Sequence, residues 1–314
     1  MIIFNRYFLI YLIFFLSCIY VSNLDLKDLV AYKNSFEIAF AYLNTISFLS
    51  EPLFSLYNAA MSFFIEDFET YKYFHIFWTF SITFIGCHVL GRFSYFESLV
   101  LFSNPALLQN YFIHLRQGMA ISIFFLIMLL FKKRIFASNR NALFYASISS
   151  FFAGLVHLSF FLIFTIFITL FLLSYLRNKE TAFSVFIPLI LLLFISFNIF
   201  FAETIRNSEV FQISFFPNGI GFGFVFALLV LIFSSSKDRQ GISINWIFAS
   251  GIISYISFYM ITPYAGRLFD SLFIILSAIF KDRIPFPFAS LLLMSAFFLM
   301  NWIYIIYFTR IWFN

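Results

Sequence analysis

The sequence has few charged residues. Only 11% of its 314 residues are Asp, Glu, Lys or Arg, whereas 63% are hydrophobic. A soluble domain carries about a quarter of its residues as charges, because its surface has to be hydrated. The mean hydropathy of +0.98 and the 55 phenylalanines therefore exclude a soluble globular domain, since so much apolar surface would aggregate in water.

Cysteine is also scarce, and the motifs of soluble enzymes are missing. Cys18 and Cys87 lie in apolar stretches, with no metal-ligand spacing and no disulfide framework. The sequence contains no phosphate-binding glycine-rich loop, no zinc-ligand helix motif and no nucleophile elbow. Its basic residues are scattered in short loops, which argues against nucleic acid as a partner. We expect no metal and no cofactor.

Apolar runs bounded by charged or turn residues make up most of the chain. A helix needs roughly 20 residues to cross a bilayer, and shorter helices cross where the bilayer thins. These runs predict an all-α fold, a polytopic integral membrane helical bundle that occupies 1–314 as a single transmembrane domain. No small-residue cleavage site follows the first run, so we expect it to be retained. About eleven candidate spans result, at 7–22, 73–91, 94–114, 117–131, 141–155, 158–176, 182–202, 220–234, 243–262, 268–280 and 287–308.

The basic residues predict the orientation of the bundle. If Arg6 is cytoplasmic and the short apolar stretch 52–65 does not cross, most of the 19 lysines and arginines lie on the cytoplasmic side, including the cluster at 132–140. The segment 23–72 then lies outside the membrane. We expect 52–65 to form an amphipathic helix at the outer interface.

One candidate span contains an interruption. Within 94–114, Ser103-Asn104-Pro105 supplies a helix cap and a proline at a first helical position. A break at membrane depth frees backbone groups that protein or water has to satisfy. Such breaks occur at substrate sites, and they also occur as kinks that help packing. The sequence leaves both explanations open.

Polar residues at the outer ends of the spans are the candidates for function. Ionisable groups in the hydrocarbon region cost roughly 2.5–3.5 kcal/mol on insertion scales. Arg116, His157 and Arg267 all fall on the predicted outer side. Taken singly, each arginine is explained as a headgroup anchor and the histidine as a hydrogen-bonded turn residue. Together they are harder to explain in this way, because short outer loops are poor in arginine.

These residue types suit the recognition of a pyrophosphate. Arginine binds phosphate oxygens bidentately, and histidine acts as a general base near neutral pH. A helix over 110–117 would place Asn110, His114 and Gln117 on one face. Glu51 is the best placed outer carboxylate, although such acids also simply solvate a loop. We predict catalytic roles for His157, Glu51 and Arg116, and substrate binding by Arg267, Gln117, Asn110, His114, Tyr264 and Arg206.

The string Leu-Arg-Gln-Gly-Met-Ala at 115–120, which opens an apolar helix, resembles the Ile-Arg-Gln-x-x-Ala hallmark of the EpsG-like family. That family comprises Wzy-type polymerases of O-antigen, capsule and exopolysaccharide. Glu51-Pro52-Leu53-Phe54, His157-Leu158-Ser159 and Arg267 occur in the same order as in the family pattern. Leu115 replaces the usual isoleucine, and the interruption at 104–105 is not part of the pattern.

The resemblance implies a specific reaction and location. An oligosaccharide on undecaprenyl pyrophosphate is transferred to a lipid-linked repeat unit at the outer face of the bacterial inner membrane, by a multi-pass enzyme without a nucleotide sugar. Arg116 and Arg267 would hold the donor pyrophosphate or the acceptor glycan, and His157 or Glu51 would activate the acceptor hydroxyl. The implied partners are undecaprenyl-pyrophosphate-linked glycans and the lipid bilayer, with a chain-length regulator and a flippase as further candidates.

Two other classes of membrane protein remain as alternatives. A polyprenyl-phosphate-sugar glycosyltransferase also carries acids in its first outer loop, as Asp25 and Asp28 do here, and commonly needs a metal. A transporter or flippase of lipid-linked oligosaccharide would line a central cavity with charge. The candidate spans are nearly free of charge, with Glu97 and Asp270 as the main exceptions near span ends.

Overall fold

A computed structural model describes residues 2–23, 27–38, 51–112, 114–175 and 265–280, together with Ser295 and Leu299. Within these residues the chain is helical apart from short turns, and it contains no strand. The predicted all-α fold is thus confirmed for this part of the chain. The predicted spans 182–202, 220–234 and 243–262, and all but two residues of 287–308, lie outside the described residues.

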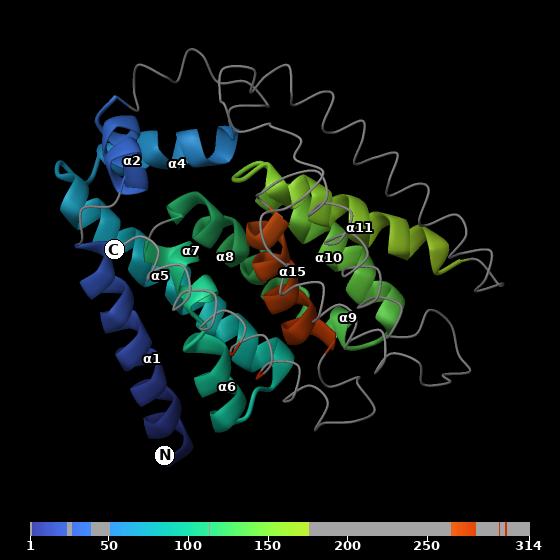
Figure 1. Ribbon diagram of the computed structural model, residues 1–314. Coiled ribbons are helices and arrows are strands. Elements are labelled where there is room, and N and C mark those ends of the chain that lie inside the picture. Colours follow the sequence, from blue (N-terminus) through green and yellow to red (C-terminus); the bar gives the residue numbers. More distant parts are fainter. Residues whose placement is uncertain are drawn as a thin grey trace, which may run out of the picture.

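The helices occupy most of the apolar runs that the sequence contains (Figure 1). The segment 23–72 contributes a helix within the predicted stretch 52–65 and a second, more polar helix that the sequence did not predict. The helices are α1 (Ile2–Ser22), α2 (Lys27–Glu37), α4 (Pro52–Ser62), α5 (Phe68–Gly91), α6 (Tyr95–Phe102), α7 (Pro105–Phe112), α8 (Leu115–Leu130), α9 (Lys132–Ile135), α10 (Asn139–Gly154), α11 (Ser159–Leu173) and α15 (Ala265–Phe280).

Local capping fixes where several helices begin. Asp67 caps α5 by accepting a hydrogen bond from the backbone N–H of Thr70 at 2.8 Å. Ser94 and Glu97 form a reciprocal capping box at the start of α6. Each capping side chain satisfies a backbone N–H that has no partner inside its helix. The boundaries of these helices are therefore specified by the sequence next to them.

The predicted interruption at 103–105 is confirmed. α6 ends at Phe102 and α7 begins at Pro105, so the run 94–114 forms two helices of eight residues each. At 1.5 Å per residue each is roughly 12 Å long, and neither crosses a bilayer alone. A second break follows, because α7 ends at Phe112 and α8 begins at Leu115. The break lies close to the predicted boundary between the spans 94–114 and 117–131, and the helix over 110–117 that would give Asn110, His114 and Gln117 a common face does not form.

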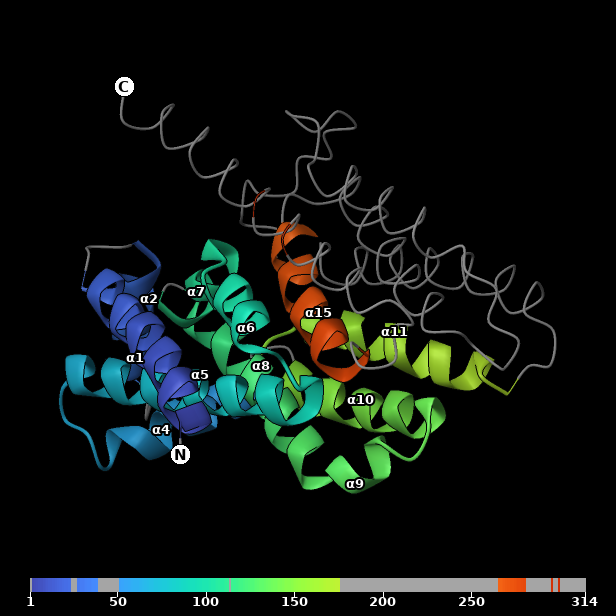
Figure 2. The same cartoon turned by 90° about the horizontal axis from the view of Figure 1, so that it is seen from below.

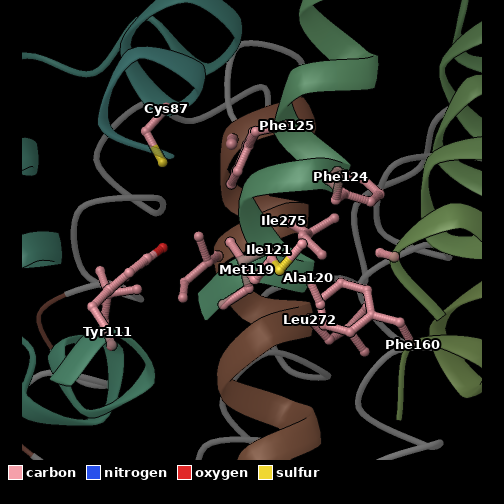
Figure 3. Close-up of a cluster of buried hydrophobic side chains, with 14 of the residues drawn as sticks. Cys87, Tyr111, Met119, Ala120, Ile121, Phe124, Phe125, Phe160, Leu272 and Ile275 are labelled. Atoms are coloured by element: carbon pink, nitrogen blue, oxygen red, sulfur yellow. The ribbon is translucent and has the colours of Figure 1, made fainter. Parts of the chain in front are cut away.

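Helix α8 lies at the centre of the bundle. It packs against α5 and α10 along its length, and α15 lies beside it. Figure 3 shows buried side chains of α8, among them Ile121 and Phe124, meeting Ile275 of α15 and Phe160 of α11. Tyr111 of α7 and Cys87 of α5 lie on the opposite side of α8. The helix that carries Arg116 is thus held on several sides by close-packed apolar residues.

Small and hydroxylated residues allow α8 to approach its neighbours closely. A Cβ added at Gly118 would lie 2.3 Å from the backbone oxygen of Asn110, so only glycine fits against α7 there. The Ser122 hydroxyl lies 2.7 Å from the Thr79 carbonyl oxygen and 3.2 Å from the Thr83 hydroxyl, both on α5. Such contacts are typical of helices that pack in apolar surroundings.

The two ends of the bundle differ in charge. Helices α2 and α4 lie across one end, and α6 and α9 lie toward the other (Figure 1), which is the end seen from below in Figure 2. The guanidinium of Arg92, directly after α5, lies 5.2 Å from the Phe136 ring, which follows α9. The exposed lysines and arginines at 132–134 and Arg140 therefore gather near the end of α5. The 24 residues of α5 extend roughly 36 Å from that end to α2 and α4.

Among the described residues, only α5 is long and apolar enough to cross a membrane by itself. Tyr7–Ser22 of α1, α8, and Ser159–Leu172 of α11 are apolar but shorter. The predicted number of about eleven spans is therefore not confirmed, whereas the helical character of the runs that the structure describes is confirmed. Four of the eleven predicted runs lie wholly or largely outside the described residues, so the predicted number of crossings stays a prediction.

Candidate functional site

Glu51 lies directly before α4, in a backbone conformation that lets its carboxylate contact other parts of the chain. Pro52 is the first residue of the helix, and Glu51 is its N-cap with φ 54° and ψ 65°. Left-handed backbone at a non-glycine residue costs on the order of 1–3 kcal/mol, and it persists where surrounding contacts enforce it. The side chain makes no capping hydrogen bond to its own helix. It is buried, with 8% of its side chain exposed, and is directed to distant parts of the chain.

Arg116, the second residue of α8, is the first partner of this carboxylate. Its Nη1 donates to Glu51 Oε2 at 2.5 Å, across 65 positions of sequence. Its Nε donates to the Tyr32 hydroxyl of α2 at 3.4 Å. The guanidinium also lies over the rings of Tyr32 and Phe54, at 5.3 and 6.0 Å from their centroids. Contacts with Tyr32 of α2, Phe54 of α4 and Glu51 just before α4 thus fix the plane of the guanidinium. Even so, 45% of the Arg116 side chain is exposed.

His157, in the turn between α10 and α11, is the second partner. Its Nδ1 lies 2.7 Å from Glu51 Oε1, and the backbone N–H of Leu158 donates to the same oxygen at 3.3 Å. An ionised carboxylate only accepts hydrogen bonds, so Nδ1 is the donating nitrogen. In the neutral ring, Nε2 is then the nitrogen that can accept a proton. The His157 side chain is 27% exposed, so it is open to a ligand to a degree that Glu51 is not.

The electrostatics favour an ionised Glu51. Burial pushes the pKa of the Glu51 carboxyl upward from 4.5. The hydrogen bond and charge of His157, with those of Arg116, outweigh burial and lower this pKa to about 2. The negative charge of Glu51 balances the positive charge of Arg116. The cluster of Glu51, Arg116 and His157 is therefore neutral when His157 is neutral, and it gains one positive charge when His157 is protonated.

One backbone–backbone hydrogen bond and one side-chain contact to the backbone connect the segments that carry the cluster. The N–H of Leu53 donates to the Leu155 carbonyl oxygen at 3.0 Å, which joins the first turn of α4 to the turn that carries His157. His75 of α5, which is fully buried, places Nε2 3.1 Å from the carbonyl oxygen of Leu115, the residue before Arg116. The same imidazole packs edge-on against Phe54 of α4. His75 therefore links the helix start that carries Arg116 to the helix that begins after Glu51.

Tyr32 and His75 were not among the residues predicted from the sequence. For His75 a signal existed, because an ionisable side chain inside an apolar run is costly and needs a partner. Tyr32 gave no signal, because it lies in the polar stretch that became α2.

Three further predicted residues lie near the cluster but serve the packing of α7, α8 and α15. Gln117 is buried and donates from Nε2 to the Ser271 hydroxyl of α15 at 2.7 Å. Asn110 is buried in α7, and its backbone oxygen lies against Gly118. His114 is the N-cap of α8. The predicted common face of Asn110, His114 and Gln117 does not form, because the chain breaks after Phe112.

The remaining predicted residues belong to the later part of the chain. The backbone of Arg267 lies in the first turn of α15, one helical turn before Ser271. Its side chain lies outside what the structure describes, as do Tyr264 and Arg206. The described residues contain no cluster of three or more side chains of the kinds that hold a metal ion.

Comparison with known proteins yields no relative for this chain. No family model, no curated protein and no solved structure matches it. The resemblance of 115–120 to the EpsG-like hallmark therefore stays a prediction. What the described residues provide for function is the geometry of Glu51, Arg116 and His157.

Proposed function

We propose that the protein is a membrane glycan polymerase. It transfers an oligosaccharide chain from undecaprenyl pyrophosphate to a lipid-linked repeat unit at the outer face of the bacterial inner membrane. The observation that carries this proposal is the cluster of Glu51, Arg116 and His157, in which a fixed guanidinium and an imidazole base lie on either side of one buried carboxylate. The hallmark-like string at 115–120 supports it from the sequence.

The location in a membrane is supported by composition and by exposed surface. Large apolar side chains such as Leu16, Phe77 and Leu130 are exposed on α1, α5 and α8, where lipid would cover them. Helices shorter than α5 fit a bilayer by local thinning and by polar residues that reach the interface from their ends. The cluster lies at the end of the bundle opposite the exposed basic residues at 132–134. The positive-inside rule makes that basic end cytoplasmic and the cluster extracytoplasmic.

In the proposed reaction, a hydroxyl oxygen of the acceptor sugar attacks the anomeric carbon of the donor chain. The bond from that carbon to the pyrophosphate oxygen breaks, and undecaprenyl pyrophosphate leaves with the bonding electron pair. His157 Nε2 takes the proton of the attacking hydroxyl. Arg116 stabilises the charge that develops on the leaving pyrophosphate. Glu51 touches neither substrate, because it is buried behind both side chains, and it orients them.

The exposure and contacts of Glu51 and His157 favour His157 as the general base. The sequence left the choice between His157 and Glu51 open. Glu51 is nearly unexposed and holds its proton only in strong acid, so it is a poor acceptor for a substrate proton. His157 is partly exposed, and its Nδ1 contact to Glu51 leaves Nε2 for the acceptor hydroxyl.

The test is the glycan profile of a deletion strain complemented with variants. We expect Arg116→Ala and His157→Ala to accumulate single repeat units on the lipid carrier, because chemistry stops after the repeat is exported. Lys33→Ala, which removes an exposed outer cation of α2, should restore long polymer and serves as the control.

The same profile separates the alternatives. Loss of a single-sugar transferase would give repeat units that lack one sugar. Loss of a flippase would leave complete repeats on the inner leaflet. Long polymer in the Arg116→Ala strain, with the protein present at normal levels, would refute the proposed role of Arg116.

A further inference from the structure

Glu51 and Tyr32 already accept hydrogen bonds from the guanidinium of Arg116. Glu51 accepts from Nη1 at 2.5 Å and Tyr32 accepts from Nε at 3.4 Å, so two of the three nitrogens are held by the protein. A carboxylate and a phosphate bind arginine through the same type of charge-assisted hydrogen bonds. Any pyrophosphate that binds Arg116 therefore competes with Glu51 for donors and for charge.

The charges of the cluster make this competition strong. Arg116 alone would present one positive charge to an anion, but Glu51 cancels it at hydrogen-bond distance. Because Glu51 has 8% of its side chain exposed and Arg116 has 45%, the carboxylate sits behind the guanidinium and water screens their interaction poorly. A ligand on the exposed side thus meets a neutral pair unless His157 also carries a proton.

We propose that Glu51 is an internal counter-anion for Arg116 that limits how tightly the site holds the product pyrophosphate. This inference rests on the proposed function. During the transfer step, the acceptor proton moves to His157, so the cluster becomes positive as the leaving pyrophosphate gains charge. When His157 passes that proton to water, the cluster returns to neutral and the product is released. Glu51 is thus a positioning residue that acts through Arg116 and His157.

The experiment measures binding of inorganic pyrophosphate to the full-length protein in nanodiscs, by calorimetry at neutral pH. Glu51→Gln keeps the shape of the side chain and removes its charge, so we expect pyrophosphate to bind about tenfold more tightly than to the unmodified protein. Glu37→Gln removes an exposed carboxylate of α2 and should leave the affinity unchanged. If Glu51 had only a structural role, Glu51→Gln would bind pyrophosphate more weakly than the unmodified protein, which is the opposite result.

Turnover provides the second readout. In Glu51→Gln we expect kcat to fall and KM for the lipid-linked donor to fall with it, because a tighter complex releases product more slowly. Glu51→Asp retracts the carboxylate by one methylene and serves as the second variant if Glu51→Gln does not fold. It should show a smaller gain in pyrophosphate affinity.

The outcomes separate this inference from the proposed function. If the unmodified protein binds pyrophosphate and neither Glu51 variant binds it more tightly, the counter-anion role is refuted while the polymerase proposal stands. If the unmodified protein, Glu51→Gln and Arg116→Gln all fail to bind, Arg116 is not the anion site and both proposals fail. Tighter binding by Glu51→Gln that Arg116→Gln abolishes in the double variant supports both.

Discussion

At the scale of single residues, burial is graded across the cluster. Glu51 is enclosed, His157 is partly open and Arg116 is nearly half exposed. A buried charge is stabilised only by close partners, because water cannot reach it. The carboxylate therefore depends on its two side-chain partners and on the Leu158 N–H, whereas the guanidinium can also be solvated. Protonation of Glu51 is therefore expected to weaken its contacts with Arg116 and His157.

Acid should destabilise the protein through Glu51. Its pKa is lowered in the folded protein from 4.5 to about 2, so folding favours the ionised form. The stabilisation is fully present above pH 4.5, and it is lost as the pH falls toward about 2. We expect the Tm in detergent to decline over this window. In Glu51→Gln the decline should be smaller, because that variant has no carboxyl to protonate there, and an equal decline in both proteins would contradict the assignment.

The sequence predicted the members of the cluster but not their contacts. The charges of the loops placed Arg116, His157 and Glu51 on one side of the bundle. They could not indicate that Glu51 bridges the other two, because these partners lie 65 and 106 positions away along the chain. The fork of Arg116 was expected to be available to phosphate, and the structure instead holds it against a carboxylate. Only tertiary packing determines such a pairing.

At the scale of helices, the contact between α7 and α8 depends on Gly118. A Cβ at this position would lie 2.3 Å from the Asn110 oxygen and 3.1 Å from its carbonyl carbon. Both are backbone atoms, so the clash cannot be relieved by rotating a side chain. Gly118→Ala should destabilise the protein by about 1–3 kcal/mol, the usual range for overpacking. Helix propensity alone predicts the opposite sign, since alanine stabilises a helix relative to glycine.

Thermal unfolding in detergent checks this prediction. Leu126→Ala, on the exposed face of the same helix, is the control and should change stability much less. We also expect Gly118→Ala to lower polymer yield, because Arg116 lies only two residues before the clash. A Gly118→Ala protein as stable as the unmodified one would show that α7 and α8 are not in backbone contact.

The junction between α1 and α5 depends on Lys72. Its ammonium donates to the Ser22 carbonyl oxygen at 2.9 Å, at the end of α1, and pairs with Glu69 at 2.5 Å. The lysine side chain is 3% exposed, so its removal leaves the Ser22 carbonyl without this donor. Lys72→Met should lower the free energy of unfolding by about 1–3 kcal/mol.

Lys33→Met is the matched control for Lys72→Met. Lys33 pairs with Glu37 at 3.9 Å, and both side chains are more than half exposed. Exposed pairs of this kind contribute about 0–1 kcal/mol. Equal losses in the two variants, measured by thermal unfolding of the purified proteins, would contradict a capping role for Lys72.

The two breaks around α7 show which helix ends a sequence can predict. The break before Pro105 follows from local chemistry, because proline lacks an N–H and favours a first helical position. The break after Phe112 has no glycine or proline beside it. There, the Gln117 contact to Ser271, the Gly118 contact to α7 and the His75 contact to Leu115 hold the start of α8. The polar residues at 114–117 placed a boundary between two predicted spans near this break. The contacts of His75 and Gln117 join residues 40 and 154 positions apart, so the local sequence does not predict them.

At the scale of the whole molecule, several described helices are shorter than the width of a bilayer. α8 and α10 have 16 residues each and α11 has 15, which corresponds to roughly 22–24 Å against a hydrocarbon core of about 30 Å. The sequence predicted correctly that these segments are helical, because apolar composition and capping act locally. How many cross a membrane depends on tilt and on the depth of their polar ends, which neighbouring helices determine.

The proposed orientation of the bundle in the membrane can be tested with single-cysteine variants at its two ends. Glu66 is exposed between α4 and α5, at the end that carries the cluster, and Lys133 is exposed in α9 at the other end. We expect Glu66→Cys to react with a membrane-impermeant maleimide in spheroplasts, and Lys133→Cys to react only after the membrane is permeabilised. The unmodified protein is the control, because Cys18 and Cys87 are fully buried. Labelling of Lys133→Cys in intact spheroplasts would show that the orientation is the reverse of the proposed one. The cluster would then lie on the cytoplasmic side, where a polymerase that uses exported lipid-linked repeats could not work.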